Sequence, residues 1–78
     1  MLKEIEFFFT NIEKPEINKE MRNLVTDNII DSLDIMMLVN EIEKYYNIPL
    51  KSEFILIENF ESYEAIERMI KKAINHGK

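Results

Sequence analysis

The chain contains no cysteine, and this absence removes several classes of function at once. Disulfide bonds, thiolate metal sites and cysteine nucleophiles all require a thiol. Histidine occurs once, as His76 near the C-terminus, so a histidine-based catalytic triad or zinc site has almost no residues to use. We therefore expect no metal site, no catalytic residue and no enzymatic activity, and we assign His76 to a poorly ordered tail.

Positive charge is also scarce. The chain has 15 acidic and 10 basic residues, which give a net charge of −5. Nucleic-acid binding needs a basic stripe that displaces counterions from phosphates, and the sequence has none. An acidic surface suits a partner with a basic face, because complementary fields speed encounter. Ordinary solubility explains the same charge, and composition alone does not choose between the two.

Long apolar runs are missing as well. The sequence starts Met1-Leu2-Lys3-Glu4, with an acid where a signal peptide would be basic, and its longest apolar run is far too short to cross a bilayer. We therefore expect a soluble, cytoplasmic protein that does not insert into membranes. A length of 78 residues predicts a single domain over residues 1–78, with a thin margin of stability, and we expect a monomer.

The chain has one glycine and two prolines, so residues that break helices are few. Apolar residues at helical spacing predict a first helix of about three turns, which Pro15 ends because its ring cannot continue a helix. These residues are Leu2, Ile5, Phe8, Phe9 and Ile12, whereas Phe7 falls off the stripe. Residues 13–31 then form a long polar connection. Its few apolar residues, which include Ile17 and Leu24, predict that it is tied to the core.

A second helix is predicted from Ser32 to about Tyr46, with Asp31 as its N-cap. One face carries a core stripe of apolar residues. The stripe consists of Ile35, Leu38, Val39, Ile42 and Tyr46. Residues 49–61 predict only one short helical turn, around 52–56. Ser62 then caps a last helix, with Lys71 and Lys72 in its final turn and Gly77 as its stop. The apolar face of that helix consists of Ile66, Met69, Ile70, Ala73 and Ile74. The predicted fold is all-α, a small four-helix bundle with three longer helices, one short helix and a long first loop.

The second helix also carries apolar residues away from its core stripe. On a helical wheel Leu33 and Met37 fall almost opposite the stripe, and Met36 lies on the flank. The acids Asp34, Glu41 and Glu43 border this surface. Exposed apolar residues with an acidic rim predict a surface that docks a partner, and methionine adapts to varied partners. Two other readings remain: single exposed apolar residues are common, and another helix could cover these.

Ser32 stands at the first helical position, directly after the cap. A serine there is usually only a tolerated residue. The position is nevertheless exposed and lies in a field that favours anions, so a phosphodiester on this hydroxyl would meet unpaired backbone N–H groups. Its neighbours Asp31 and Asp34 are carboxylates with no histidine between them, so no base is present to make the serine a nucleophile.

The stretch Asp31-Ser32-Leu33-Asp34, followed by the helix to Glu43 and the exit Tyr46-Asn47-Ile48-Pro49, resembles the acyl carrier protein family. The likeness covers about residues 24–74, and Asp27 stands where the family often has an acid. The resemblance implies that Ser32 bears a phosphopantetheine arm and that Asp31, Leu33 and Asp34 serve recognition by a phosphopantetheinyl transferase. It further implies that the arm carries an acyl or aminoacyl group as a thioester, so that the partners are a loading ligase and downstream transferases.

The chain departs from the family's usual pattern at three places, and these bear on which biosynthetic pathway it would serve. Ile29 and Ile30 replace a glycine-containing stretch, Met37 stands where fatty-acid carriers often have glutamate, and the exit loop after the second helix is short. Residues 49–62 are similar to carriers of aminoacyl groups, including D-alanyl carriers. Fatty-acid, polyketide and nonribosomal peptide biosynthesis all stay open. A rival hypothesis is an unmodified helical interaction module that uses Leu33, Met36 and Met37 to bind a partner.

Overall fold

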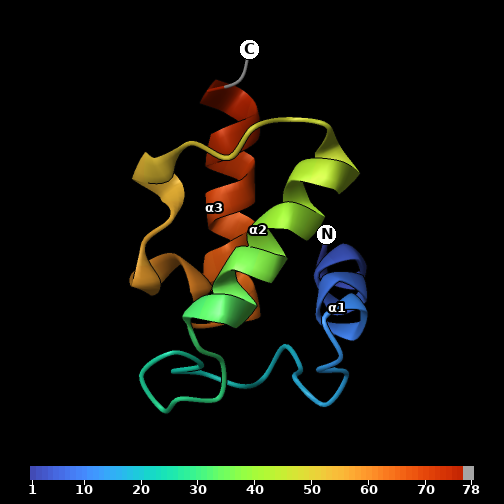
Figure 1. The fold of residues 1–78 in the computed structure, drawn as a ribbon, viewed down its shortest axis with the longest axis vertical. Helices are drawn as coiled ribbons and strands as arrows, with labels where there is room; N and C mark the ends of the chain where they lie inside the picture. Colours follow the sequence, from blue (N-terminus) through green and yellow to red (C-terminus); the bar gives the residue numbers. More distant parts are fainter. Residues whose placement is uncertain (77–78) are drawn as a thin grey trace.

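The computed structural model describes residues 1–76, and these contain three α-helices, two 3-10 turns and no strand (Figure 1). The α-helices are α1 (Leu2–Asn11), α2 (Ser32–Tyr46) and α3 (Tyr63–His76). The 3-10 turns are η1 (Ser52–Phe54) and η2 (Ile57–Phe60). The all-α class is thus confirmed. The expected stop at Gly77 lies outside the described residues, and α3 includes the backbone of His76, which the sequence had assigned to the tail.

Where a short fourth helix is predicted, the structure has the two 3-10 turns η1 and η2, and the four-helix bundle is not confirmed. Ile55 ends η1 with φ −89° and ψ 71°, and Leu56 precedes η2 in an extended conformation, with φ −118° and ψ 144°. Neither pair of angles continues a helix. The Asn59 side-chain amide donates to the Phe54 carbonyl at 2.8 Å and so joins the two turns. Phe54 and Phe60, one from each turn, are both buried, so the core anchors both turns.

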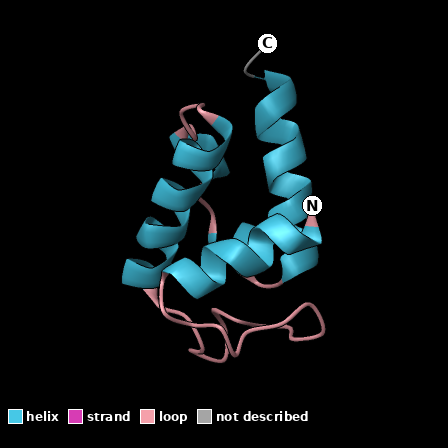
Figure 2. Ribbon diagram, turned by 90° about the vertical axis from the view of Figure 1, so that its right-hand side faces the viewer, coloured by secondary structure: helices cyan, strands magenta, loops and turns pink. Residues whose placement is uncertain are grey.

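The helices are not all parallel. Figure 2 shows α1 lying across the molecule, whereas α2 and α3 run along its length, and α1 packs against both. Residues 12–31 run below the helices, at the end of the molecule opposite the last residues of α3. Within residues 1–76 no helix combines the length and the hydrophobicity that crossing a bilayer requires.

The core is rich in aromatic side chains. Phe8, Phe9 and Phe60 are fully buried, and the ring of Phe9 stacks on that of Tyr63 with centroids 5.3 Å apart. The Tyr63 hydroxyl donates to the carbonyl of Ile17 at 3.0 Å, which ties the long loop to α3. The two predicted apolar stripes on α2 and α3 also face this core. Their buried members are Ile35, Leu38, Val39, Ile42, Ile66, Met69, Ile70 and Ala73, while Tyr46 and Ile74 are partly buried.

The loop between α1 and α2 is anchored, as its apolar residues predict. Ile17, Leu24 and Ile30 are buried in the core. The carbonyl of Leu24 accepts hydrogen bonds from the amides of Ile29 and Ile30, at 2.8 and 3.0 Å, which closes residues 24–30 into a compact turn. Asn28 lies within that turn at φ 58°, a left-handed conformation that asparagine tolerates better than most residues.

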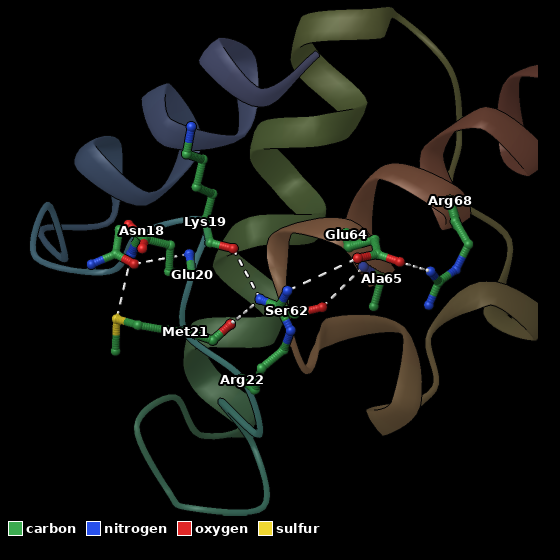
Figure 3. Close-up of polar contacts among 9 residues, drawn as sticks. All are labelled: Asn18, Lys19, Glu20, Met21, Arg22, Ser62, Glu64, Ala65 and Arg68. Atoms are coloured by element: carbon green, nitrogen blue, oxygen red, sulfur yellow. Dashed lines mark hydrogen bonds and ion pairs between the residues drawn. The ribbon is translucent and has the colours of Figure 1, made fainter.

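The start of α3 contacts the same loop (Figure 3). The hydroxyl of Ser62 accepts the amide of Ala65 at 3.1 Å, so Ser62 caps α3 as predicted. Glu64, one residue into the helix, pairs with Arg68 at 2.6 Å and with Arg22 of the loop at 4.0 Å. An open groove of about 680 Å³ lies between the start of α1, residues 19–22 and α3. Its charges are mixed in sign, and none of residues 31–34 lines it.

Glu61 makes the most extensive contact between the loop and the η2–α3 junction. Its carbonyl accepts the amide of Leu24 at 3.0 Å. Its side-chain Oε1 accepts the amides of Val25 and Thr26, at 2.8 and 3.0 Å, and Oε2 accepts the hydroxyl of Thr26. We call this set of four hydrogen bonds the Glu61 clasp. The hydrogen bond from the Thr26 hydroxyl, followed by those from the backbone, lowers the pKa of the Glu61 carboxyl.

The Glu61 clasp predicts that the stability of the fold depends on pH. Because the folded-state pKa lies below the ordinary value of 4.5, the ionised form stabilises the fold above that pH, and the contribution disappears as the pH falls through the lowered pKa. We expect Glu61→Gln to show a shallower decrease of melting temperature below the ordinary glutamate pKa than the wild type. Thermal melts by circular dichroism across this range measure both slopes. Equal slopes for the two proteins would contradict the prediction.

Candidate functional site

The chain has three serines, and their surroundings differ sharply. Ser62 is buried and already serves as the cap of α3. Ser52 is exposed, but it opens a helix of only 3 residues, which has too few aligned peptides to create a field. Ser32 is exposed and opens the 15-residue helix α2. It is therefore the serine that combines access from solvent with the positive end of a long helix.

Asp31 and Asp34 cap this helix reciprocally. Oδ1 of Asp31 accepts the amide of Asp34 at 2.9 Å, and Oδ2 of Asp34 accepts the amide of Asp31 at 3.1 Å. This capping box satisfies two backbone donors and fixes where Ser32 begins the helix. The hydrogen bond from the Asp34 amide is the main cause that lowers the pKa of the Asp31 carboxyl. The predicted N-cap is thus confirmed.

Asp34 lies in a different environment from the one that the helical wheel predicts. It does not border an exposed surface, because only 8% of the residue is accessible. Its carboxylate turns back to the amide of Asp31 and forms an ion pair with Lys14 at 3.7 Å. The amide of Lys14 in turn donates to the carbonyl of Phe9 at 2.9 Å. Asp34 therefore joins the end of α1 to the start of α2, and its side chain is not free to meet a partner.

Lys14 is a residue of the site that the sequence does not single out. It lies in a polar stretch before Pro15, and no periodicity connects it with Ser32, which is 18 positions further along the chain. The fold brings its ammonium group to the carboxylate of Asp34, and its positive charge also contributes to the lowered pKa of Asp31. The surroundings of Ser32 therefore combine a cation and a helix N-terminus with the two aspartates that form the cap.

Two of the predicted docking residues are strongly exposed. Leu33 is 64% and Met36 is 65% accessible, and as residues i and i+3 they are neighbours on the surface of α2. Met37 does not lie opposite the core as the wheel predicts. It is partly buried against the core and lines a shallow groove with Ile12, at the end of α1. The apolar surface near Ser32 on α2 is therefore narrower than predicted, and we define it as Leu33 and Met36.

Glu41 and Glu43 are engaged within the chain. Oε1 of Glu41 accepts the side-chain amide of Asn11 at 2.6 Å, and Oε2 of Glu43 accepts the amide of Leu50 at 2.7 Å. Both acids are partly buried, so the rim that they form is less available than the sequence predicts. Sequence reasoning also misses a second apolar group, because Ile55 and Leu56 between η1 and η2, and Ile57 at the start of η2, are all exposed. No periodic pattern in that short segment separates exposed from buried residues.

The described groups that form the cap around Ser32 are charged or polar. Among the residues whose side chains are described, no cluster of histidines and acids has the arrangement of a metal site. The cap is held together by the Asp31 and Asp34 carboxylates and their backbone amides, with the Lys14 ammonium group beside Asp34. A nucleophilic serine needs a base within hydrogen-bond reach, and the aspartates are occupied by the capping box. The arrangement can carry an anionic substituent on Oγ of Ser32.

Asp31→Ala tests the cap directly. Losing an N-cap acceptor is expected to lower the melting temperature by about 4–8 °C in a domain of this size. A thermal melt followed by circular dichroism measures the change, with Asp27→Ala as a matched control, since Asp27 is an exposed acid of the preceding turn. If the two variants melt together, the capping box contributes nothing measurable.

No family model, curated protein or solved structure matches the chain. The features that bear on function are therefore those of this chain: the exposed serine at the start of α2, the capping box around it, and the exposed apolar pair Leu33, next to Ser32, and Met36, one turn further along.

Proposed function

We propose that the chain is a carrier protein of the acyl carrier type, with Ser32 as the attachment point for phosphopantetheine. The observation that supports this proposal most strongly is the position of Ser32, exposed at the first residue of a capped 15-residue helix. Further support comes from the motif Asp31-Ser32-Leu33-Asp34, which resembles the family's attachment motif. The order of helix, long loop and helix is consistent with the same family.

The surroundings of Ser32 fit a phosphodiester. The first backbone N–H groups of α2 are unpaired within the helix except where the cap satisfies them, and they point toward an anion attached at the helix start. Lys14 adds a positive charge beside the cap, at 3.7 Å from Asp34. Ser32 lies on the surface, so a long flexible arm can extend from it into solvent.

The attachment reaction is a phosphoryl transfer from coenzyme A. The hydroxyl oxygen of Ser32 forms a bond to the phosphorus next to the pantetheine, and the bond from that phosphorus to the bridging oxygen of the pyrophosphate breaks. Adenosine bisphosphate leaves, and a base of the transferase takes the hydroxyl proton, because the chain supplies none. Once attached, the arm ends in a thiol that holds an acyl or aminoacyl group as a thioester, which the cysteine-free chain itself could not form.

The intact mass of the protein tests the proposal. After incubation with coenzyme A and a promiscuous phosphopantetheinyl transferase, we expect the mass to rise by one phosphopantetheine group, with one equivalent of adenosine bisphosphate released. A reaction without the transferase is the control. A protein whose mass does not change, in an assay where a known carrier is modified to completion, is not a carrier of this type.

The proposal also defines the setting of the protein. It acts as a non-enzymatic monomer in the cytoplasm, and its partners are the transferase, a loading ligase for an acyl or aminoacyl group and downstream transferases. Tethering the cargo raises its effective concentration at each partner. In this setting η1 and η2 take the place of the short fourth helix of the bundle.

A second candidate is an unmodified helical module that binds one partner. The observation in its favour is the exposure of Leu33 and Met36, which needs no modified serine to bind an apolar surface. The mass measurement separates the two functions, because the interaction module keeps its mass. Binding of a partner that is indifferent to Ser32→Ala would favour the second candidate.

Truncation of Leu33 and Met36 probes the surface that both candidates share. We expect Leu33→Ala and Met36→Ala each to lose about 1–2 kcal/mol of binding to the transferase, a rise in KM of roughly five- to thirtyfold, with almost unchanged melting temperature. Both side chains are mostly in solvent, so their removal leaves the core intact.

Phe7→Ala is the control for this prediction. Phe7 is also a large exposed side chain, but its ring lies beside that of Tyr45, near the opposite end of α2 from Ser32. Its removal should leave KM unchanged. If all three variants raise KM equally, the effect does not come from a surface near Ser32.

A further inference from the structure

The Glu61 clasp acts on the part of the loop that leads into the candidate site. The amides of Leu24, Val25 and Thr26 all donate to Glu61, and the hydroxyl of Thr26 donates to it as well. One residue of the η2–α3 junction therefore accepts every hydrogen bond that this short stretch directs toward α3. The next contacts along the chain are internal, because the carbonyl of Leu24 accepts the amides of Ile29 and Ile30.

Residues 24–30 lie immediately before the capped helix. Figure 1 shows this part of the loop leading upward into the first turn of α2. Ile30, the last residue of the turn, is buried, and Asp31 follows it as the N-cap. Residues 26–28, between the buried Leu24 and the buried Ile30, are exposed. The exposed residues 26–28 thus lie four to six positions before the exposed Ser32 in the chain.

We propose, on the basis of the carrier function above, that Glu61 is a positioning residue for the modification of Ser32. By holding residues 24–26 at the start of α3, it presents the turn 24–30 beside Ser32 as part of the surface that the transferase recognises. Glu61 itself touches neither the serine nor the coenzyme A. Its effect passes through the backbone of the loop.

This role predicts an effect on KM and not on kcat. Without the clasp, the turn populates its native arrangement for only a fraction of the time, and the apparent affinity of the transferase falls by that same fraction. We expect Glu61→Ala to raise KM for the carrier roughly five- to tenfold, which corresponds to a native turn populated for about 10–20% of the time. The kcat should stay within about twofold, since the bound complex restores the turn.

The KM and kcat of the transferase, measured for four variants of the carrier below their melting temperatures, test the proposal. Glu61→Ala removes all three side-chain hydrogen bonds. Glu61→Gln keeps an oxygen that can accept the two amides, so it should restore much of the wild-type KM. Thr26→Val removes only the hydroxyl, and it keeps the test valid if Glu61→Ala does not fold. Glu64→Ala is the matched control, because Glu64 also joins α3 to the long loop, through Arg22 at 4.0 Å, but outside the turn 24–30.

The outcomes separate this inference from the function on which it rests. A KM raised in Glu61→Ala and Thr26→Val, partly restored in Glu61→Gln and normal in Glu64→Ala supports positioning by the clasp. If the clasp variants lose melting temperature but keep the wild-type KM, Glu61 is only a structural residue and the inference is wrong. If the wild type is not modified at all, the carrier function fails, and the positioning role fails with it.

Discussion

Ser32→Ala is expected to abolish the incorporation of phosphopantetheine completely while the helical circular dichroism stays unchanged. The reaction needs a hydroxyl oxygen to attack phosphorus, and alanine offers none. The fold should tolerate the change, because Ser32 is exposed and the capping hydrogen bonds belong to Asp31 and Asp34. Alanine also has a high intrinsic helix propensity. Intact mass after reaction with transferase and coenzyme A gives the result.

Ser52→Ala provides the matched control for this experiment. Ser52 is exposed as well, yet it opens η1, and its replacement should leave incorporation at the wild-type level. Incorporation that persists in Ser32→Ala and disappears in Ser52→Ala would move the attachment point to the other exposed serine. Incorporation that survives both replacements would exclude a phosphoserine linkage at either position.

The second large effect is expected in the core. Ile42 is fully buried on the apolar stripe of α2, so Ile42→Ala opens a cavity and should cost about 2–5 kcal/mol of unfolding free energy. At roughly 0.05–0.15 kcal/mol per residue, a domain of 78 residues has a total stability of only about 4–12 kcal/mol, so the variant should lose a large part of it. Urea unfolding followed by circular dichroism measures the loss, and the fraction that remains folded should still be modified at Ser32.

Met37→Ala is the companion measurement. Met37 is only partly buried, at the groove beside Ile12, so its truncation should cost clearly less than that of Ile42. Leu33→Ala should cost least, since Leu33 is mostly in solvent. The predicted order of destabilisation is therefore Ile42, Met37 and Leu33. A reversed order would mean that the helix packs with a different face toward the core.

The parts of the fold that the sequence predicts are those set by local patterns. The bounds of α2 follow from the Asp31 cap and from a stripe of apolar residues at helical spacing, and its end follows from Asn47, which adopts a left-handed conformation with φ 55°. The start of α3 is predictable in the same way, because Ser62 is a local N-cap whose hydroxyl accepts the amide of Ala65. The position of Ser32 was predictable because the signal, an N-cap followed by an amphipathic helix, depends on neighbouring residues only.

The parts that it does not predict depend on contacts between distant segments. A helical wheel places Met37 opposite the core, but the structure has it partly buried against the core, beside a groove that Ile12 at the end of α1 also lines. Asp34 becomes buried through an ion pair with Lys14. Glu61 accepts hydrogen bonds from residues more than 30 positions away. None of these pairs leaves a periodic trace in a single sequence.

The Tyr63 stack gives the protein an optical reporter of its own loop. The chain has no tryptophan, so its three tyrosines dominate its near-ultraviolet absorbance. Burial raises the pKa of Tyr63 and of Tyr46, and only Tyr63 donates its hydroxyl proton to the loop, at the carbonyl of Ile17. Ionising Tyr63 therefore removes a bond that holds residues 12–31. In an alkaline spectrophotometric titration, the phenolate of Tyr63 should form together with loss of this one hydrogen bond, so the contact between Tyr63 and Ile17 can be followed without an added label.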